Sequence, residues 1–192
     1  QPLLEAHPEN PLSHLAIGVW LIVHPEAVDR AEASLARSLE LQGGRWQPRY
    51  GWLAGKMQYY AGRYERSIEI LSESIESTGT RDRFSESRLE EMAMTPRQDA
   101  STDPRIFAFL ALASRELGRL EDADHYLAAH RRVLPGTPWT DYEQGRLLLA
   151  RELPEEAVEA VSRALDLDPS YVFAWSQRGR ARLGIDDDSG GK

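Results

Sequence analysis

The side chains best suited to acid–base or metal chemistry are five histidines, and their spacing gives them no shared site. They are His7, His14, His24, His125 and His130. A zinc-binding helix commonly places two histidines four positions apart in a HExxH motif, and this pattern does not occur in the sequence. His125 and His130 are five positions apart, so they would lie on different sides of one helix. We therefore expect no metal ion, no cofactor and no histidine-based catalysis.

The sequence also lacks the glycine-rich and nucleophile motifs of common enzyme classes. It has no GxSxG turn for a serine nucleophile, no GxxxxGKS loop for phosphates and no GxGxxG dinucleotide fingerprint. Gly43-Gly44 is typical of a helix end followed by a turn. The adjacent carboxylates Glu155-Glu156 lie at a predicted helix start, where acids interact favourably with the helix dipole. We predict that the chain is not itself an enzyme.

The net charge and the hydropathy of the chain exclude further classes of partner. The 192-residue chain has a formal net charge of −8, which argues against nucleic acid because phosphate binding needs a basic surface. Its longest apolar run, 15–23, is well short of the roughly 18 residues of a membrane span, so we expect no membrane insertion. The absence of cysteine excludes disulfides. It leaves both a cytoplasmic and a periplasmic location open, with the cytoplasm favoured.

The elements that position the remaining side chains follow a repeat. Ala123 and Ala157 lie 34 positions apart, and an earlier copy begins at Ala61-Gly62-Arg63. A period of this length is typical of a helical solenoid, in which each helix pair packs on its neighbours. The same spacing relates Leu127 to Val161 and Pro135 to Pro169.

Helical spacing and prolines predict an ordered series of helix pairs. The predicted pairs are 12–41 with a break at His24-Pro25, 48–60 with 64–76, 104–117 with 120–133, and 138–151 with 154–167, followed by a lone helix over 171–183. The corresponding organisation is the end of a truncated preceding repeat (1–10), repeat 1 (11–44), repeat 2 (45–76), an insertion (77–103), repeat 3 (104–137), repeat 4 (138–171), a capping helix (172–184) and a disordered tail (185–192). We expect one short helix, 87–94, inside the insertion.

This pattern resembles the tetratricopeptide repeat family. The matching residues are a small residue midway along the first helix of each pair (Gly18, Gly55, Ala111, Gly145, Gly179), a small residue early in the second (Ala31, Ser67, Ala123, Ala157) and closing prolines (Pro8, Pro135, Pro169). Glu152 and Pro154 depart from the family by replacing its usual turn glycine and aromatic residue. The resemblance implies an all-α, right-handed superhelical solenoid of antiparallel helix pairs, with about four repeats and a terminal capping helix.

In this family the first helix of each pair lines the concave face of the solenoid. The resemblance therefore implies a basic and aromatic groove formed by Arg49, Trp52, Lys56, Tyr59, Arg105, Arg115, Trp139, Tyr142, Arg146, Phe173 and Arg180. Arginine matches carboxylate geometry, and aromatic faces provide apolar contact. An alternative interpretation is that the aromatic residues pack between repeats and the arginines are merely solvated.

The resulting hypothesis is a protein-interaction scaffold that binds an extended acidic or C-terminal peptide in this groove. The lysine–asparagine carboxylate clamp of the chaperone-binding members is not supported, because Leu15, Val19 and Trp52 stand where its polar residues would be needed. The alternative is a regulatory or substrate-guiding segment of a larger multidomain enzyme, or of an assembly that exports an anionic polysaccharide. We also expect uncovered apolar surface before Leu12, which would permit self-association.

Overall fold

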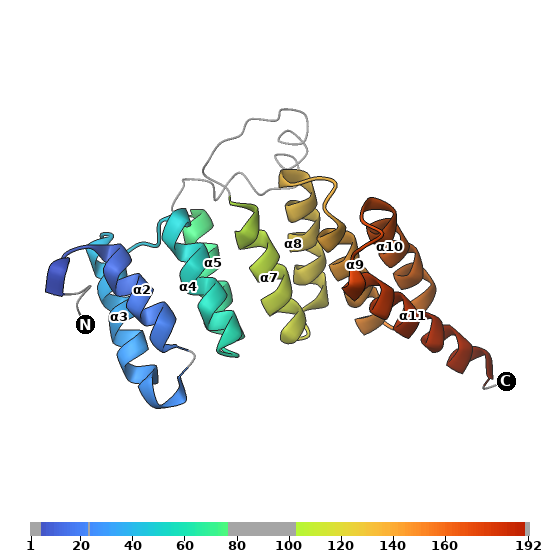
Figure 1. Ribbon diagram of the computed structural model, residues 1–192, viewed down its shortest axis with the longest axis horizontal. Helices are drawn as coiled ribbons and strands as arrows, with labels where there is room; N and C mark the ends of the chain where they lie inside the picture. The colour runs from blue at the N-terminus through green and yellow to red at the C-terminus, as the bar shows by residue number, and fades with distance from the viewer. Residues whose placement is uncertain (1–4, 23, 77–102, 191–192) are drawn as a thin grey trace. The chain divides into compact units, whose positions relative to one another are not determined.

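The computed structural model describes residues 5–22, 24–76 and 103–190, and within these ranges the chain is all-α with no strand. Nine α-helices and one short 3-10 helix are described, and consecutive helices pack as antiparallel pairs at α2 with α3, α4 with α5, and α9 with α10 (Figure 1). The chain divides into two compact units, Gln1–Leu117 and Gly118–Lys192, which are described separately.

The first unit contains two helix pairs and one further helix. Helix α2 packs against α3, α4 packs against α5, and α7 packs against both α4 and α5. The bounds of these helices are Pro11–Leu21 (α2), Val28–Leu41 (α3), Pro48–Tyr60 (α4), Tyr64–Glu76 (α5) and Pro104–Glu116 (α7).

Close approach within each pair of the first unit depends on a glycine in its first helix. A Cβ atom added to Gly18 would stand 2.8 Å from Leu35 Cγ, and one added to Gly55 would come closer still to Leu71. Leu35 and Leu71 are both buried, so a larger residue at either glycine would force the helices apart. The neighbouring Ser67 is also buried, and its hydroxyl donates a hydrogen bond to the Gly55 carbonyl at 2.8 Å.

Local sequence explains where these helices begin and end. Proline stands at the first position of α2, α4 and α7, where its missing N–H costs no helical hydrogen bond. The side chain of Asn10 caps α2 by accepting from Leu12 N at 2.9 Å. Helix α3 ends at Leu41 and is followed by Gly43 and Gly44, which have φ angles of 82° and 78°. The Gly44 N–H donates to the Leu39 carbonyl at 3.0 Å, as in a glycine-terminated helix.

The second unit contains four helices. Helix α9 packs against α8 and α10, and α11 packs against α10 and α9. The bounds are Leu120–Val133 (α8), Pro138–Ala150 (α9), Pro154–Leu167 (α10) and Val172–Gly190 (α11). Gly145 on α9 faces buried Val161 on α10 in the same manner as the glycines of the first unit.

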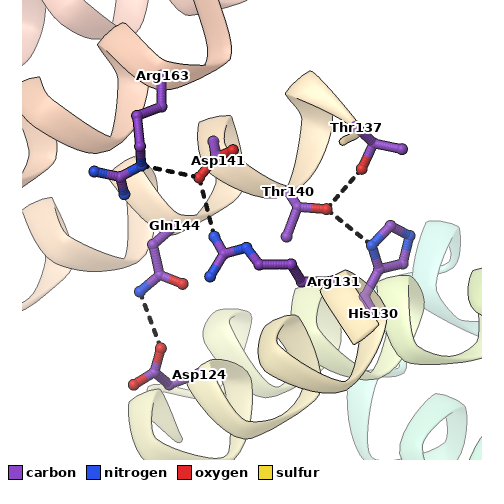
Figure 2. Close-up of polar contacts among 8 residues, drawn as sticks. All are labelled: Asp124, His130, Arg131, Thr137, Thr140, Asp141, Gln144 and Arg163. Carbon is purple, nitrogen blue, oxygen red and sulfur yellow. Dashed lines mark hydrogen bonds and ion pairs between the residues drawn. The ribbon is translucent and has the colours of Figure 1, made fainter. Parts of the chain in front are cut away.

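A network of polar side chains joins α8, α9 and α10, as Figure 2 shows. Asp141 on α9 accepts hydrogen bonds from Arg131 on α8 at 3.0 Å and from Arg163 on α10 at 3.3 Å. The Asp141 side chain is 14% exposed, so both arginines reach a largely covered carboxylate. We call this network the Asp141 joint; it comprises Asp124, His130, Arg131, Thr137, Thr140, Asp141, Gln144 and Arg163.

The predicted helix bounds agree closely with those of the structure up to α10, and the all-α fold class is confirmed. The predicted end of the last helix is wrong, because α11 continues to Gly190, and the predicted disordered tail over 185–192 is helical over 185–190. Glu152 does occupy the turn position of the usual glycine, with a φ angle of 60°. The predicted insertion, with its short helix, lies outside the described residues except for Asp103.

Candidate ligand-binding surfaces

The aromatic and basic residues predicted for the first unit gather on two neighbouring helices. The guanidinium carbon of Arg105 on α7 lies 3.7 Å from the ring centroid of Trp52 on α4, which is a stacked cation–π contact. Because α4 packs against α7, this contact joins the faces of two helices that are distant in the sequence. We call this the α4–α7 surface; it comprises Trp52, Lys56, Tyr59, Tyr60, Arg105 and Phe109.

Lys56 lies among three aromatic rings of this surface. Its Nζ atom is 5.7 Å from the ring centroid of Trp52, 5.8 Å from that of Tyr60 and 6.0 Å from that of Phe109. These distances are at the outer limit of a cation–π contact, which contributes about 0.5–1 kcal/mol at an exposed site. No carboxylate of the described residues forms an ion pair with Lys56. The rings therefore orient the ammonium group without neutralising its charge.

The aromatic rings of the α4–α7 surface also contact one another. Tyr59 lies 5.5 Å from Tyr60 and 5.7 Å from Phe109, and Tyr60 lies 6.0 Å from Phe109, measured between ring centroids. Tyr60 is 61% exposed, whereas Tyr59 is half-buried. Tilted and edge-to-face rings at these spacings stabilise one another, so the surface is pre-ordered before any ligand arrives.

Arg105 already has a carboxylate partner at the helix start. Asp103 caps α7 by accepting from Arg105 N at 3.0 Å, and it also accepts from Arg105 Nε at 2.8 Å. Burial raises the pKa of the Asp103 carboxyl, but its hydrogen bonds to Arg105 and the arginine charge together hold that pKa below its ordinary value. The hydrogen bond to Asp103 raises the pKa of Arg105 in turn. Asp103 thus holds the Arg105 side chain in position and partly neutralises its charge, whereas the charge of Lys56 is not neutralised by a described carboxylate.

The residues predicted for the second unit form a different kind of cluster. Arg146 lies 5.8 Å from the ring of Tyr142 and donates to Glu143 at 3.0 Å, where Glu143 is buried. Tyr142 and Tyr171 contact each other at 5.3 Å and pack against the apolar core of the unit. Burial, followed by the nearby Tyr142 and Glu143, raises the pKa of Tyr171 to about 12. These aromatic residues support packing, as the alternative interpretation expected, and the cluster carries its own acid.

Trp139 packs against the Asp141 joint. Its ring lies 4.8 Å from that of His130, which is buried and shares a hydrogen bond with Thr140 Oγ1 at 2.9 Å. Burial, together with the neighbouring Arg131 charge, lowers the pKa of His130 to about 4. The histidine is therefore neutral at neutral pH and acts as a packed polar residue of the joint.

The other predicted residues are dispersed. Phe173 contacts Tyr171 at 6.1 Å and is 67% exposed, and Arg180 is exposed on the same helix. The Arg115 side chain is only 10% exposed and donates to Glu116 at 2.6 Å, so it presents little surface to a ligand. The side chain of Arg49 lies outside what the structure describes.

Two aromatic residues that complete these clusters were not predicted for the groove. Phe109 was missed because, from the predicted helix 104–117, only Arg105 and Arg115 were assigned to the groove. Tyr171 was missed because it was assigned to the start of the last helix, whereas it precedes α11 and contacts Tyr142. A stricter test of helical spacing would have found Phe109, which lies four positions after Arg105.

Among the described residues, no group of three or more histidine and carboxylate side chains is arranged to hold a metal ion. No helix in the described ranges is long and apolar enough to cross a bilayer.

Comparison with known proteins yields matches among solved structures. No family model and no curated protein matches the chain. Among solved structures, the chain is similar to YrrB, described as a TPR protein with an unusual peptide-binding site. The two share 17% sequence identity with a TM-score of 0.39, over 92% of this chain and 95% of that one. A likeness at this level carries no inference about the ligand of this chain.

Proposed function

We propose that this protein is an interaction scaffold that binds an extended peptide segment bearing carboxylates through the α4–α7 surface. The observation that carries the proposal is Lys56, whose ammonium group lies among three aromatic rings with no acid partner in the described residues. A carboxylate of the ligand, either a C-terminus or an acidic side chain, would pair with Lys56. The neighbouring rings would contact the apolar parts of the peptide.

The distribution of charge supports an acidic ligand at this surface rather than general attraction. The whole chain carries a formal charge of −8, so it repels polyanions at long range. Lys56 and Arg105 are a local positive feature within that field. Recognition would therefore need close contact and would depend on shape as well as on charge.

Arg105 would take part in peptide binding by exchanging Asp103 for a carboxylate of the ligand. Its guanidinium stacks on Trp52 and is bound on one side by Asp103. An incoming carboxylate would compete with Asp103 or use the remaining N–H donors of the guanidinium fork. This arrangement lowers the net gain at Arg105, so we assign the larger part of the binding free energy to Lys56 and the rings.

The experiment is a titration of the purified chain with labelled peptides that end in an acidic, aromatic-containing sequence. Each peptide is compared with its C-terminally amidated, Asn- and Gln-substituted form at low and moderate salt. The proposal expects saturable, salt-sensitive binding of the acidic form. Lys56→Met, which keeps most of the apolar stem, should weaken that binding about tenfold, because it removes one charge-assisted contact.

The matched control is Arg132→Met, since Arg132 is an exposed cation on α8 outside the α4–α7 surface. It removes the same formal charge and should leave peptide affinity unchanged. Equal affinity of the wild type and Lys56→Met for all acidic peptides would overturn the proposal. Binding of an anionic oligosaccharide in place of every peptide would overturn it in favour of a polysaccharide-guiding role.

A further inference from the structure

Among the described residues, helix α11 has no second helix packed against its glycine, whereas α2, α4 and α9 each have one. Gly18, Gly55 and Gly145 each face a branched aliphatic side chain from the second helix of their pair, namely Leu35, Leu71 and Val161. Gly179 on α11 matches these glycines in the repeat. Apart from its two chain neighbours and the backbone of its own helix, however, no atom of the described residues lies within 4 Å of where its Cβ would stand. Beside the other three glycines a branched side chain fills the space, and beside Gly179 no described side chain does so. We call this space the seat at Gly179.

The face around Gly179 is apolar and exposed. Val172, Trp175 and Leu183 are 74%, 50% and 64% exposed. With Gly179 they follow a spacing of three, four and four positions, which places all four on one side of a helix. Ala174, Gln177 and Ala181 are buried, and they lie on the opposite side, where α11 packs against its neighbours. A helix that merely ended the array would present a polar outer face.

Charged residues border this apolar face. Arg178 and Arg182 lie along one edge and Arg180 along the other, according to helical spacing. None of the three forms an ion pair with a described carboxylate. Arg178 stacks on Trp175 at 4.2 Å, and the indole donates to the Pro169 carbonyl at 2.9 Å, so the tryptophan is held in position. An occupant of this face would therefore meet positive charge on both sides.

We propose that the Gly179 face of α11 is a docking site for an acidic amphipathic helix from a partner protein. The occupant would carry a small residue four positions before a branched aliphatic one, as Ala157 precedes Val161 on α10. Its aliphatic side chain would occupy the seat at Gly179, and its acidic flanks would pair with the arginines. Pairing of two α11 helices is disfavoured, because it would bring two sets of three arginines together.

The test uses a peptide with the sequence of residues 154–167, which form α10. In the protein, Val161 of this helix packs against Gly145 as the proposed occupant would pack against Gly179. Because an isolated helix of this length is marginal in water, it is stapled between positions 159 and 163, both of which are exposed in α10. The proposal expects saturable binding to the full chain, weakened by salt. A peptide in which Val161→Asp is introduced should bind at least tenfold more weakly.

The decisive variant of the protein is Gly179→Leu. It fills the seat, and leucine is a better helix former than glycine, so the fold should be retained. Peptide affinity should fall at least tenfold, whereas Ala128→Leu, a similar enlargement of the side chain at an exposed position of α8, should leave it unchanged. Arg182→Glu should weaken binding severalfold and Arg132→Glu should not.

Three outcomes would overturn this inference. One is the absence of saturable peptide binding by the folded wild type, and another is equal affinity in Gly179→Leu. The third is a concentration-dependent dimer of the wild type that Gly179→Leu dissociates in sedimentation experiments, since that would identify a second copy as the occupant. Because Gly179 lies outside the α4–α7 surface, peptide binding at Lys56 would be unaffected by Gly179→Leu, so the comparison of this variant with the wild type separates the two proposals.

Discussion

The α4–α7 surface and the Asp141 joint use the same residue types for different purposes. Both combine cationic side chains with aromatic rings and an aspartate on or beside a helix start. In the joint, the carboxylate is largely covered and accepts hydrogen bonds from two arginines, so its charges are satisfied within the protein. On the α4–α7 surface, Lys56 keeps its charge available. The presence or absence of an acid partner therefore separates a structural joint from a candidate site.

The largest expected difference between the two regions is a loss of folding stability on acidification, which arises at His130 in the Asp141 joint. Burial lowers the pKa of His130 from an ordinary 6.5 to about 4 in the folded protein. Between these values the unfolded chain binds the proton and the folded chain does not. Stability is therefore complete above about pH 6.5 and falls as the pH drops toward 4, by at most about 3 kcal/mol at about 1.4 kcal/mol per pH unit.

Urea unfolding between pH 7 and pH 4 measures this dependence. His130→Gln retains a side chain that hydrogen-bonds Thr140 but does not titrate, so it should be less stable at pH 7 and should lose less stability on acidification. The α4–α7 surface has no buried histidine of this kind among the described residues. The same pH slope in the variant and the wild type would show that other groups control acid unfolding.

A smaller effect is expected when the joint loses its carboxylate. Asp141→Ala leaves Arg131 and Arg163 without their shared acceptor, and both are about half exposed, so water replaces part of the loss. We expect the free energy of unfolding to fall by about 1–2 kcal/mol. Asp166→Ala, at an exposed position of α10, is the control and should change stability by less than about 0.5 kcal/mol. Matching losses in both variants would remove the special role of Asp141.

On the α4–α7 surface, loss of the indole should affect stability less than loss of Asp141. Trp52→Leu keeps apolar bulk but removes the ring on which Arg105 stacks at 3.7 Å. The expected loss is about 0.5–1 kcal/mol, the usual value of an exposed cation–π contact. Thermal unfolding of the wild type, Trp52→Leu, Arg105→Gln and the double variant measures the coupling between the two residues. Full additivity of the two changes would contradict a direct interaction.

The smallest expected effect is that of Lys56→Met on folding. Because Lys56 has no acid partner among the described residues, its removal should change the free energy of unfolding by less than about 0.5 kcal/mol. Denaturant unfolding of the variant used for peptide titration checks this directly. A loss above 1 kcal/mol would indicate that Lys56 is structural, and would make the α4–α7 surface resemble the joint.

Much of the fold was predictable because the sequence marks its own helix ends. Prolines stand at the first position of α4, α7 and α9. Glycines in left-handed conformation follow α3, α4 and α8. The end of α11 was not predictable in this way. The aspartates and serine after Ile185 resemble a solvated tail, and they carry no apolar periodicity that would extend the helix.

The candidate site was only partly predictable, because helical register places a residue on a face but does not identify its partners. Trp52, Lys56 and Arg105 were expected on neighbouring first helices, and they lie on α4 and α7, which pack against each other. The sequence did not show that Arg115 would be covered or that Tyr142 would join the core. Those outcomes depend on side chains that are distant in sequence, such as Tyr171.

The backbone conformation of Glu152, in the turn between α9 and α10, is a place where one substitution could raise the melting temperature of the protein. With a φ angle of 60°, it is the one residue other than glycine described in the left-handed region, where a Cβ atom is disfavoured by roughly 1–2 kcal/mol. Glycine would relieve that strain, although it would also give the unfolded chain more freedom. A net gain of about 1 kcal/mol would raise the melting temperature by about 2–4 °C for a chain of this size. One substitution at this turn would therefore offset the cost of a mildly destabilising change elsewhere, such as one that reshapes a binding surface.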